Sequence, residues 1–151
     1  MTCDICAWTP GQPVFELIYE TALWRVVLPQ NQCLLGRCVV SLKRHCGDLA
    51  GLTPDELLDW LKVVAVLEPA VRSAFGATMF NWSCYMNFAY REAAPDPHVH
   101  WWAAPRYQQA VTLGGLTFED PEFGGPYSHA RWVEVPAEVR REIVGRIQAA
   151  M

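Results

Sequence analysis

The chain is 151 residues long, which predicts one domain over residues 1–151 with room for a buried core. Hydrophobic residues make up 52% and charged residues 19% of it, a balance typical of globular proteins and not of disordered ones. The formal net charge of -4 argues against a general nucleic-acid binder, because affinity for a phosphate backbone needs a basic surface. It leaves room for a pocket that binds one small nucleotide.

The N-terminal segment has neither the basic region nor the apolar stretch of a secretory signal peptide, and no apolar run approaches the roughly 20 residues that span a bilayer. We therefore expect a cytoplasmic protein without a membrane partner. In that compartment cysteines are thiols or metal ligands more often than disulfides. The six cysteines are Cys3, Cys6, Cys33, Cys38, Cys46 and Cys84.

The first half of the chain predicts two strands and a long helix. Residues 19–28 and 36–45 are rich in β-branched and aromatic side chains and predict strands. Thr53, Pro54 and Glu56 form a capping-box pattern that begins the helix, and Gly76 is suited to end it. Apolar side chains then recur at helical spacing and predict a face that packs on the core; they are Leu57, Leu61, Val64, Leu67 and Val71.

In the second half, residues 78–87 and 98–104 predict strands, separated by a loop with two prolines over residues 88–97. Residues 108–134 predict no regular element, and residues 136–150 predict a C-terminal helix. Strands that gather around one long helix, without regular alternation of strand and helix, indicate an α+β fold with an antiparallel sheet.

Two of the four histidines lie two residues apart in the last predicted strand. Because side chains alternate across a strand, His98, His100 and Trp102 share one face. The residues between them point the other way and are expected to pack on the core; they are Val99, Trp101 and Ala103. Taken alone, such a pair indicates either two partly exposed polar residues or a catalytic or metal-binding site.

The sequence from His98 to Tyr107, HVHWWAAPRY, resembles the signature of the histidine-triad nucleotide-binding hydrolases and transferases. In that signature three histidines alternate with apolar residues and a Pro-Arg pair follows, which here is Pro105-Arg106. His100 then takes the middle position and Trp102 the third. The resemblance extends to Leu42-Lys43-Arg44-His45, to Cys3-x-x-Cys6, and to Asn87, which stands eleven residues before His98. It implies a histidine-triad-like fold, an antiparallel sheet of about five strands with one long helix and a C-terminal helix.

The resemblance also implies a mechanism. The middle histidine, His100, attacks the α-phosphorus of a dinucleoside polyphosphate or nucleoside phosphate ester and forms a nucleotidyl-histidine. A backbone carbonyl fixes the imidazole, and Asn87 donates hydrogen bonds to the phosphate. Gln30 and Asn31 fall near the segment that contacts the ribose in this family, although a polar turn between two strands explains them equally well.

Cys3 and Cys6 have the two-residue spacing common in zinc sites, and His45 and His98 complete a Cys2His2 set. Zinc-bearing members of the same family take their last ligand from the first histidine of the motif, here His98. A zinc with four protein ligands would be structural, because no coordination position stays open. Unliganded thiols are one alternative, and a redox Cys-x-x-Cys is another, although no strand precedes Cys3 as such a motif requires.

Trp102 is the main departure from the family pattern. Indole has one N–H donor and no proton that titrates near neutral pH, so Trp102 can contact a nucleotide but cannot act as a general acid. The leading hypothesis is thus a hydrolase or transferase of reduced or altered activity. The alternatives are a nucleotide-binding module without turnover and a zinc-stabilised interaction domain. The resemblance also implies a homodimer, and His129 is interpreted as a loop histidine without a partner.

Overall fold

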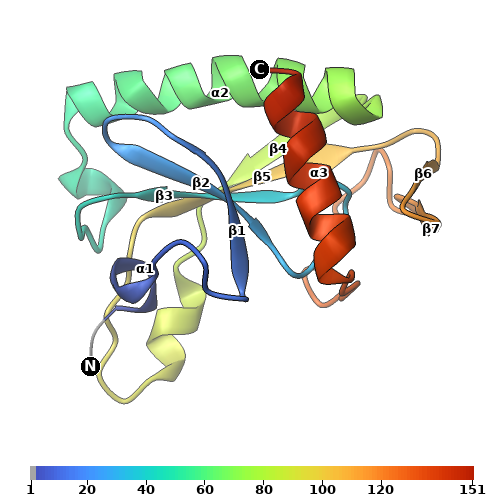
Figure 1. Cartoon of the computed structure of the whole chain (residues 1–151). Helices are drawn as coiled ribbons and strands as arrows, with labels where there is room; N and C mark the ends of the chain where they lie inside the picture. Colours follow the sequence, from blue (N-terminus) through green and yellow to red (C-terminus); the bar gives the residue numbers. More distant parts are fainter. Residues whose placement is uncertain (1–2) are drawn as a thin grey trace.

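The structure is a computed structural model that describes residues 3–151. Its centre is an antiparallel five-stranded sheet of order β1-β2-β3-β5-β4. The strands are β1 (Phe15–Glu20), β2 (Trp24–Pro29), β3 (Cys38–Leu42), β4 (Met79–Ser83) and β5 (His100–Arg106). The long helix α2 (Pro54–Phe75) lies across one face of the sheet, whereas the short helix α1 (Asp4–Ala7) and the loop after β4 lie on the opposite side (Figure 1). This architecture confirms the predicted α+β fold.

The other elements surround this sheet. They are η1 (Leu49–Gly51), η2 (Asn87–Arg91), the small hairpin of β6 (Val111–Leu113) and β7 (Leu116–Phe118), and helix α3 (Ala137–Ala149). Helix α3 packs on β1 and α2. None of the helices in residues 3–151 combines the length and the apolar composition that spanning a bilayer requires.

Helix α2 begins and ends as the sequence predicts. Thr53 Oγ1 accepts a hydrogen bond from the Glu56 amide at 3.3 Å, and Glu56 Oε2 accepts one from the Thr53 amide at 2.7 Å. The two bonds satisfy amides that have no partner inside the helix. At the other end Gly76 adopts φ 76°, a left-handed conformation that costs glycine little.

The predicted inner face of α2 is wrong at its N-terminal end. Leu57 and Leu61 are 44% and 53% exposed, and Glu56 and Asp59 are buried in their place. Asp59 Oδ2 accepts hydrogen bonds from Thr21 Oγ1 at 2.6 Å and from the Leu23 amide at 3.0 Å. Since these bonds satisfy the buried carboxylate, they fix the rotation of the helix and turn the two leucines outward.

The sequence also misplaces the first strands. Residues 19–28 include a turn at 21–23, and β1 starts earlier, at Phe15. Its register shifts between Leu17 and Tyr19, and this irregularity obscures the alternation that identifies a strand. The β6–β7 hairpin lies within residues 108–134, for which no element was predicted.

Candidate nucleotide and metal site

Strand β5 separates its side chains as predicted. Trp101 stacks on Trp60 of α2, with ring centroids 4.8 Å apart, and Val99 and Ala103 are fully buried in the same core. His100 and Trp102 therefore lie on the face of the sheet away from α2. Because β5 pairs with both β3 and β4, this face places His100 opposite Ser41 and Trp102 opposite Val39 and Ser83.

The His100 imidazole is held by the backbone. Its Nδ1 lies 2.8 Å from the His98 carbonyl oxygen, which can only accept, so Nδ1 carries the proton and Nε2 is left with its lone pair. Burial lowers the pKa of His100 below its ordinary value, and the bond to the carbonyl opposes that shift in part. A neutral imidazole with a fixed tautomer is the form in which histidine acts as a nucleophile.

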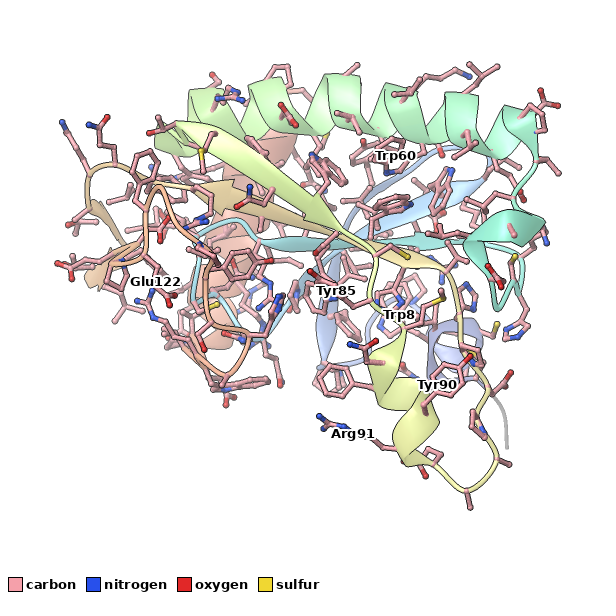
Figure 2. All side chains as sticks on the ribbon, turned by 180° about the vertical axis from the view of Figure 1, so that it is seen from behind. Trp8, Trp60, Tyr85, Tyr90, Arg91 and Glu122 are labelled. Carbon is pink, nitrogen blue, oxygen red and sulfur yellow. The ribbon has the colours of Figure 1, made fainter. Side chains whose placement is uncertain are left out.

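His100 lines a pocket of about 670 Å³, a volume suited to a small ligand. One wall is the N-terminal segment of Cys3, Asp4 and Ile5, and the other is the loop after β4. That loop contributes Tyr85, Met86, Phe88, Ala89, Glu92, Ala94 and Asp96. In Figure 2, Tyr85 lies between the segment that carries Tyr90 and the loop that carries Glu122.

The two asparagines predicted to bind nucleotide have different surroundings. Asn87 is exposed at the start of η2, between Met86 and Phe88, which both line the pocket. Asn31 is buried, and its Oδ1 accepts from the Cys33 and Val133 amides at 3.1 and 3.0 Å. Its Nδ2 donates to the Arg131 carbonyl at 3.1 Å. The Asn31 amide thus ties two distant segments together, and a ribose contact would have to break one of these bonds.

Trp102 fills the third triad position with a fixed ring. The Arg37 guanidinium carbon lies 4.0 Å from the ring centroid, and the ring packs against Trp8, Val27 and Val39. Its centroid is 6.2 Å from that of His100. The position next to the proposed nucleophile therefore holds a cation stacked on an indole, and no group that can transfer a proton.

The four predicted metal ligands form one cluster. Cys3 Sγ lies 3.3 Å from His98 Nδ1, and Cys6 Sγ lies 3.4 Å from both His98 Nδ1 and His45 Nδ1. All four ligand atoms are within 4.8 Å of one another. Two sulfurs and two imidazole nitrogens at such distances match the donor set of a tetrahedral site.

The remaining ring nitrogens support the same assignment. His98 Nε2 donates to the Leu42 carbonyl at 2.7 Å, and His45 Nε2 lies 3.1 Å from Asp96 Oδ1. Each Nε2 proton is thereby held by an oxygen, which leaves both Nδ1 lone pairs directed into the cluster. Metal-binding histidines are characteristically oriented in this way.

Two residues near this site, His129 and Arg37, were not predicted from the sequence to belong to it. His129, interpreted as a loop histidine without a partner, packs on Tyr127 and Tyr85, with ring centroids 4.8 and 5.2 Å away. Arg37 precedes β3, where a polar residue is unremarkable in a sequence. Neither residue belongs to a recognisable spacing, so the sequence offers no means of linking them to His100.

The fold places His98, His100 and Trp102 in the order that the sequence predicts for the three positions of the triad. No family model matches the chain, and no curated protein matches it. Several solved structures, in contrast, are similar to the chain in fold. A hypothetical histidine triad nucleotide-binding protein from Sulfolobus tokodaii is similar with a TM-score of 0.69 and 16% identity, over 98% of this chain and 91% of that one.

Two further solved structures share the fold. A zinc-bound histidine triad family protein from Mycobacterium smegmatis has a TM-score of 0.56 at 20% identity, over 89% of this chain and 81% of that one. A uridylyltransferase has a TM-score of 0.56 at 18% identity, over 89% of this chain and 40% of that one. The chain therefore has the fold of the histidine-triad superfamily, as the sequence predicted.

Proposed function

We propose that the chain is a nucleotide hydrolase or nucleotidyl transferase that acts at the α-phosphate through a covalent nucleotidyl-His100. The observation that carries this proposal is the hydrogen bond from His100 Nδ1 to the His98 carbonyl, which leaves Nε2 as a free nucleophile beside a pocket. The similarity in fold to a uridylyltransferase, a nucleotidyl-transferring protein by its name, supports the same class of reaction.

The reaction has two steps. The Nε2 lone pair of His100 forms a bond to the α-phosphorus while the bond to the leaving oxygen breaks, and that oxygen keeps the electron pair. Water or another acceptor then attacks the phosphorus, loses a proton, and releases His100 in its neutral form. Covalent capture divides one difficult displacement into two easier ones. Asn87, placed between two pocket residues, is proposed to donate to the phosphate. The N–H of Trp102, whose ring centroid is 6.2 Å from that of His100, is a second candidate donor.

Intact-protein mass spectrometry tests this proposal directly. The chain is incubated with mono- and dinucleoside substrates and quenched early, and the expected product is the chain plus one nucleotidyl group. Binding without adduct or turnover would favour the alternative, a nucleotide-binding module, for which the non-titrating Trp102 is the supporting observation. Absence of any nucleotide binding would leave only the zinc-stabilised interaction domain. The cytoplasmic location and the lack of a nucleic-acid partner stay predictions from the sequence.

We further propose that the Cys3, Cys6, His45 and His98 cluster holds a structural zinc. Metal analysis of protein purified without chelator should give about one zinc per chain. Cys6→Ser should lower zinc content and thermal stability together, because metal binding contributes directly to folding free energy. Cys84→Ser, a cysteine outside the cluster, should leave zinc content unchanged. Folded wild-type protein with almost no zinc would disprove the site.

The homodimer remains a prediction, and the exposed face of α2 supports it. Leu57, Leu58, Leu61 and Val66 are all exposed on this helix, an apolar surface that a second copy of the chain would cover. Light scattering should give twice the 17.1 kDa mass of one chain. Leu61→Glu should shift the mass to the monomer, because a charge would be buried without a partner. Val14→Glu, an exposed apolar residue outside α2, should stay dimeric, and a wild-type monomer would contradict the prediction.

A further inference from the structure

Arg37 is a buried cation without a carboxylate partner. It is 4% exposed, and its Nε has no hydrogen-bond partner among the described residues. The one side-chain hydrogen bond that it makes within residues 3–151 runs from Nη1 to Cys33 Sγ at 3.6 Å, a weak acceptor. Its guanidinium also stacks on the ring of Trp102.

Arg106 is a buried arginine whose hydrogen-bond donors all have partners within the chain, in contrast to Arg37. It is fully buried, and its three nitrogens donate to Asp120 at 2.6 and 3.1 Å, to Asn81 at 2.9 Å, and to the Gly125 and Glu122 carbonyls at 2.9 and 2.6 Å. A buried charge without such partners is costly to folding. The unused N–H donors of Arg37 therefore indicate that a bound anion accepts hydrogen bonds from it.

Two more buried polar groups lie on the same side of the sheet. Ser83 Oγ and the Tyr127 hydroxyl lie close enough together for Ser83 to lower the pKa of Tyr127, and neither makes a hydrogen bond of good geometry in the described chain. Both line a second pocket of about 410 Å³, together with Asn81, Tyr85 and His129. Ser83 pairs with Trp102 across β4 and β5, and Arg37 stacks on that same Trp102. Arg37 lines neither pocket itself, but it donates to Cys33 Sγ, and Tyr127 packs on the buried cluster that contains Cys33. Its positive charge also contributes to the lowered pKa of His129, after burial.

The second pocket adjoins the first, since Tyr85 lines both. Its outer wall is the loop of Tyr127 and His129, which Arg106 and Asp120 fasten to the sheet. Trp102 follows His100 on the same face of β5, and the guanidinium of Arg37 stacks on the ring of Trp102. A ligand held at His100 by one phosphate can extend its next phosphate toward Arg37.

We propose that Arg37, Ser83, Tyr127 and His129 form a second phosphate-binding subsite, which takes the phosphate beyond the α-phosphate of the substrate. This inference rests on the proposed function and narrows its substrate class to nucleotides with two or more phosphates in a chain. When His100 bonds to the α-phosphorus, the bridging P–O bond breaks and the departing phosphate keeps the electron pair. Arg37 stabilises that charge, so the leaving group needs no proton from the third triad position.

Isothermal titration of the full-length chain with sodium pyrophosphate, AMP and ADP tests the subsite. Wild type should bind pyrophosphate, and should bind ADP more tightly than AMP. Arg37→Leu should weaken pyrophosphate binding about 10- to 100-fold, the usual value of a charged hydrogen bond, and should bring ADP down to the affinity of AMP. Arg37→Lys should fall between the two, because lysine keeps the charge and loses the planar fork. Arg141→Leu, an exposed arginine on α3, removes the same charge as a control and should change nothing.

Thermal melting separates this role from a structural one. A structural Arg37 predicts that Arg37→Leu unfolds at a lower temperature, whereas an anion-binding Arg37 predicts equal or greater stability without ligand. If the leucine variant fails to fold, Ser83→Ala combined with Tyr127→Phe should still weaken pyrophosphate binding several-fold, about the value of two neutral hydrogen bonds.

Three results would overturn the subsite: no pyrophosphate binding by wild type, equal affinities for AMP and ADP, or full binding by both variants. These failures are distinct from failure of the proposed function. A nucleotidyl adduct on His100 without pyrophosphate binding removes only the subsite. Arg37-dependent pyrophosphate binding without an adduct removes only the covalent reaction.

Discussion

His100→Ala is expected to abolish both adduct formation and turnover. The variant removes the Nε2 lone pair that forms the bond to phosphorus. The neighbouring His98 cannot replace it, because His98 Nε2 is bonded to the Leu42 carbonyl and its Nδ1 faces the cysteine cluster. Loss of a nucleophile in other enzymes lowers the rate on the order of 10³- to 10⁶-fold. Initial rates and intact mass, measured on the substrate with the fastest wild-type turnover, give the result.

The fold should survive this change. The one side-chain hydrogen bond of His100 within the described residues joins it to His98 of the same strand, and the ring borders a pocket rather than the core. His100→Gln is a matched variant, since its amide can still donate to the His98 carbonyl but cannot attack phosphorus. Both variants should retain zinc content and nucleotide affinity. Turnover in either variant comparable to wild type would remove His100 from the mechanism.

Trp102→His is expected to raise turnover of substrates with poor leaving groups about 10²- to 10⁴-fold, the usual contribution of a general acid. An alkoxide leaving group needs a proton, and indole cannot supply one near neutral pH. A phosphate leaving group carries its charge more readily, so its rate should change little. The measurement is the ratio of kcat/KM for a nucleoside alkyl ester and for a nucleotide with a phosphate leaving group, in wild type and variant.

The variant also has a structural cost, because the indole packs against Trp8, Val27 and Val39 and carries Arg37 on its face. We expect a loss of about 1–3 kcal/mol in the free energy of unfolding, so rates are compared below the melting transition of both proteins. Trp102→Phe is the matched control, which keeps an aromatic ring and adds no acid, and its rate ratio should equal that of wild type. A stable Trp102→His protein with the wild-type ratio would show that the third position has no role in protonation.

The features that the sequence predicts best are those fixed by neighbours along the chain. The capping box of Thr53 and Glu56 joins residues three apart, so its two hydrogen bonds follow from the local sequence. Alternation along β5 likewise separates His100 and Trp102 from Val99 and Ala103 without reference to any other strand. The spacing of Cys3 and Cys6 and the position of His98 in the triad motif are local patterns too, and they predict three of the four residues that the structure brings together in the metal cluster.

Contacts between distant segments decided the rest. Periodicity gives the width of the apolar stripe on α2 but not its rotation, which Asp59 sets by bonding Thr21 and Leu23 of the β1–β2 turn. Asn31 resembles a ribose contact in the sequence, yet its amide bonds backbone groups a hundred residues away. Arg37 and Ser83 come from separate segments, and only the pairing of β3, β5 and β4 places them beside Trp102. Tyr127 joins Ser83 in the second pocket through a loop that Arg106 holds. A short-range pattern carries no information on such contacts, because their free energy comes from burial and hydrogen bonds that exist only once the chain has closed on itself.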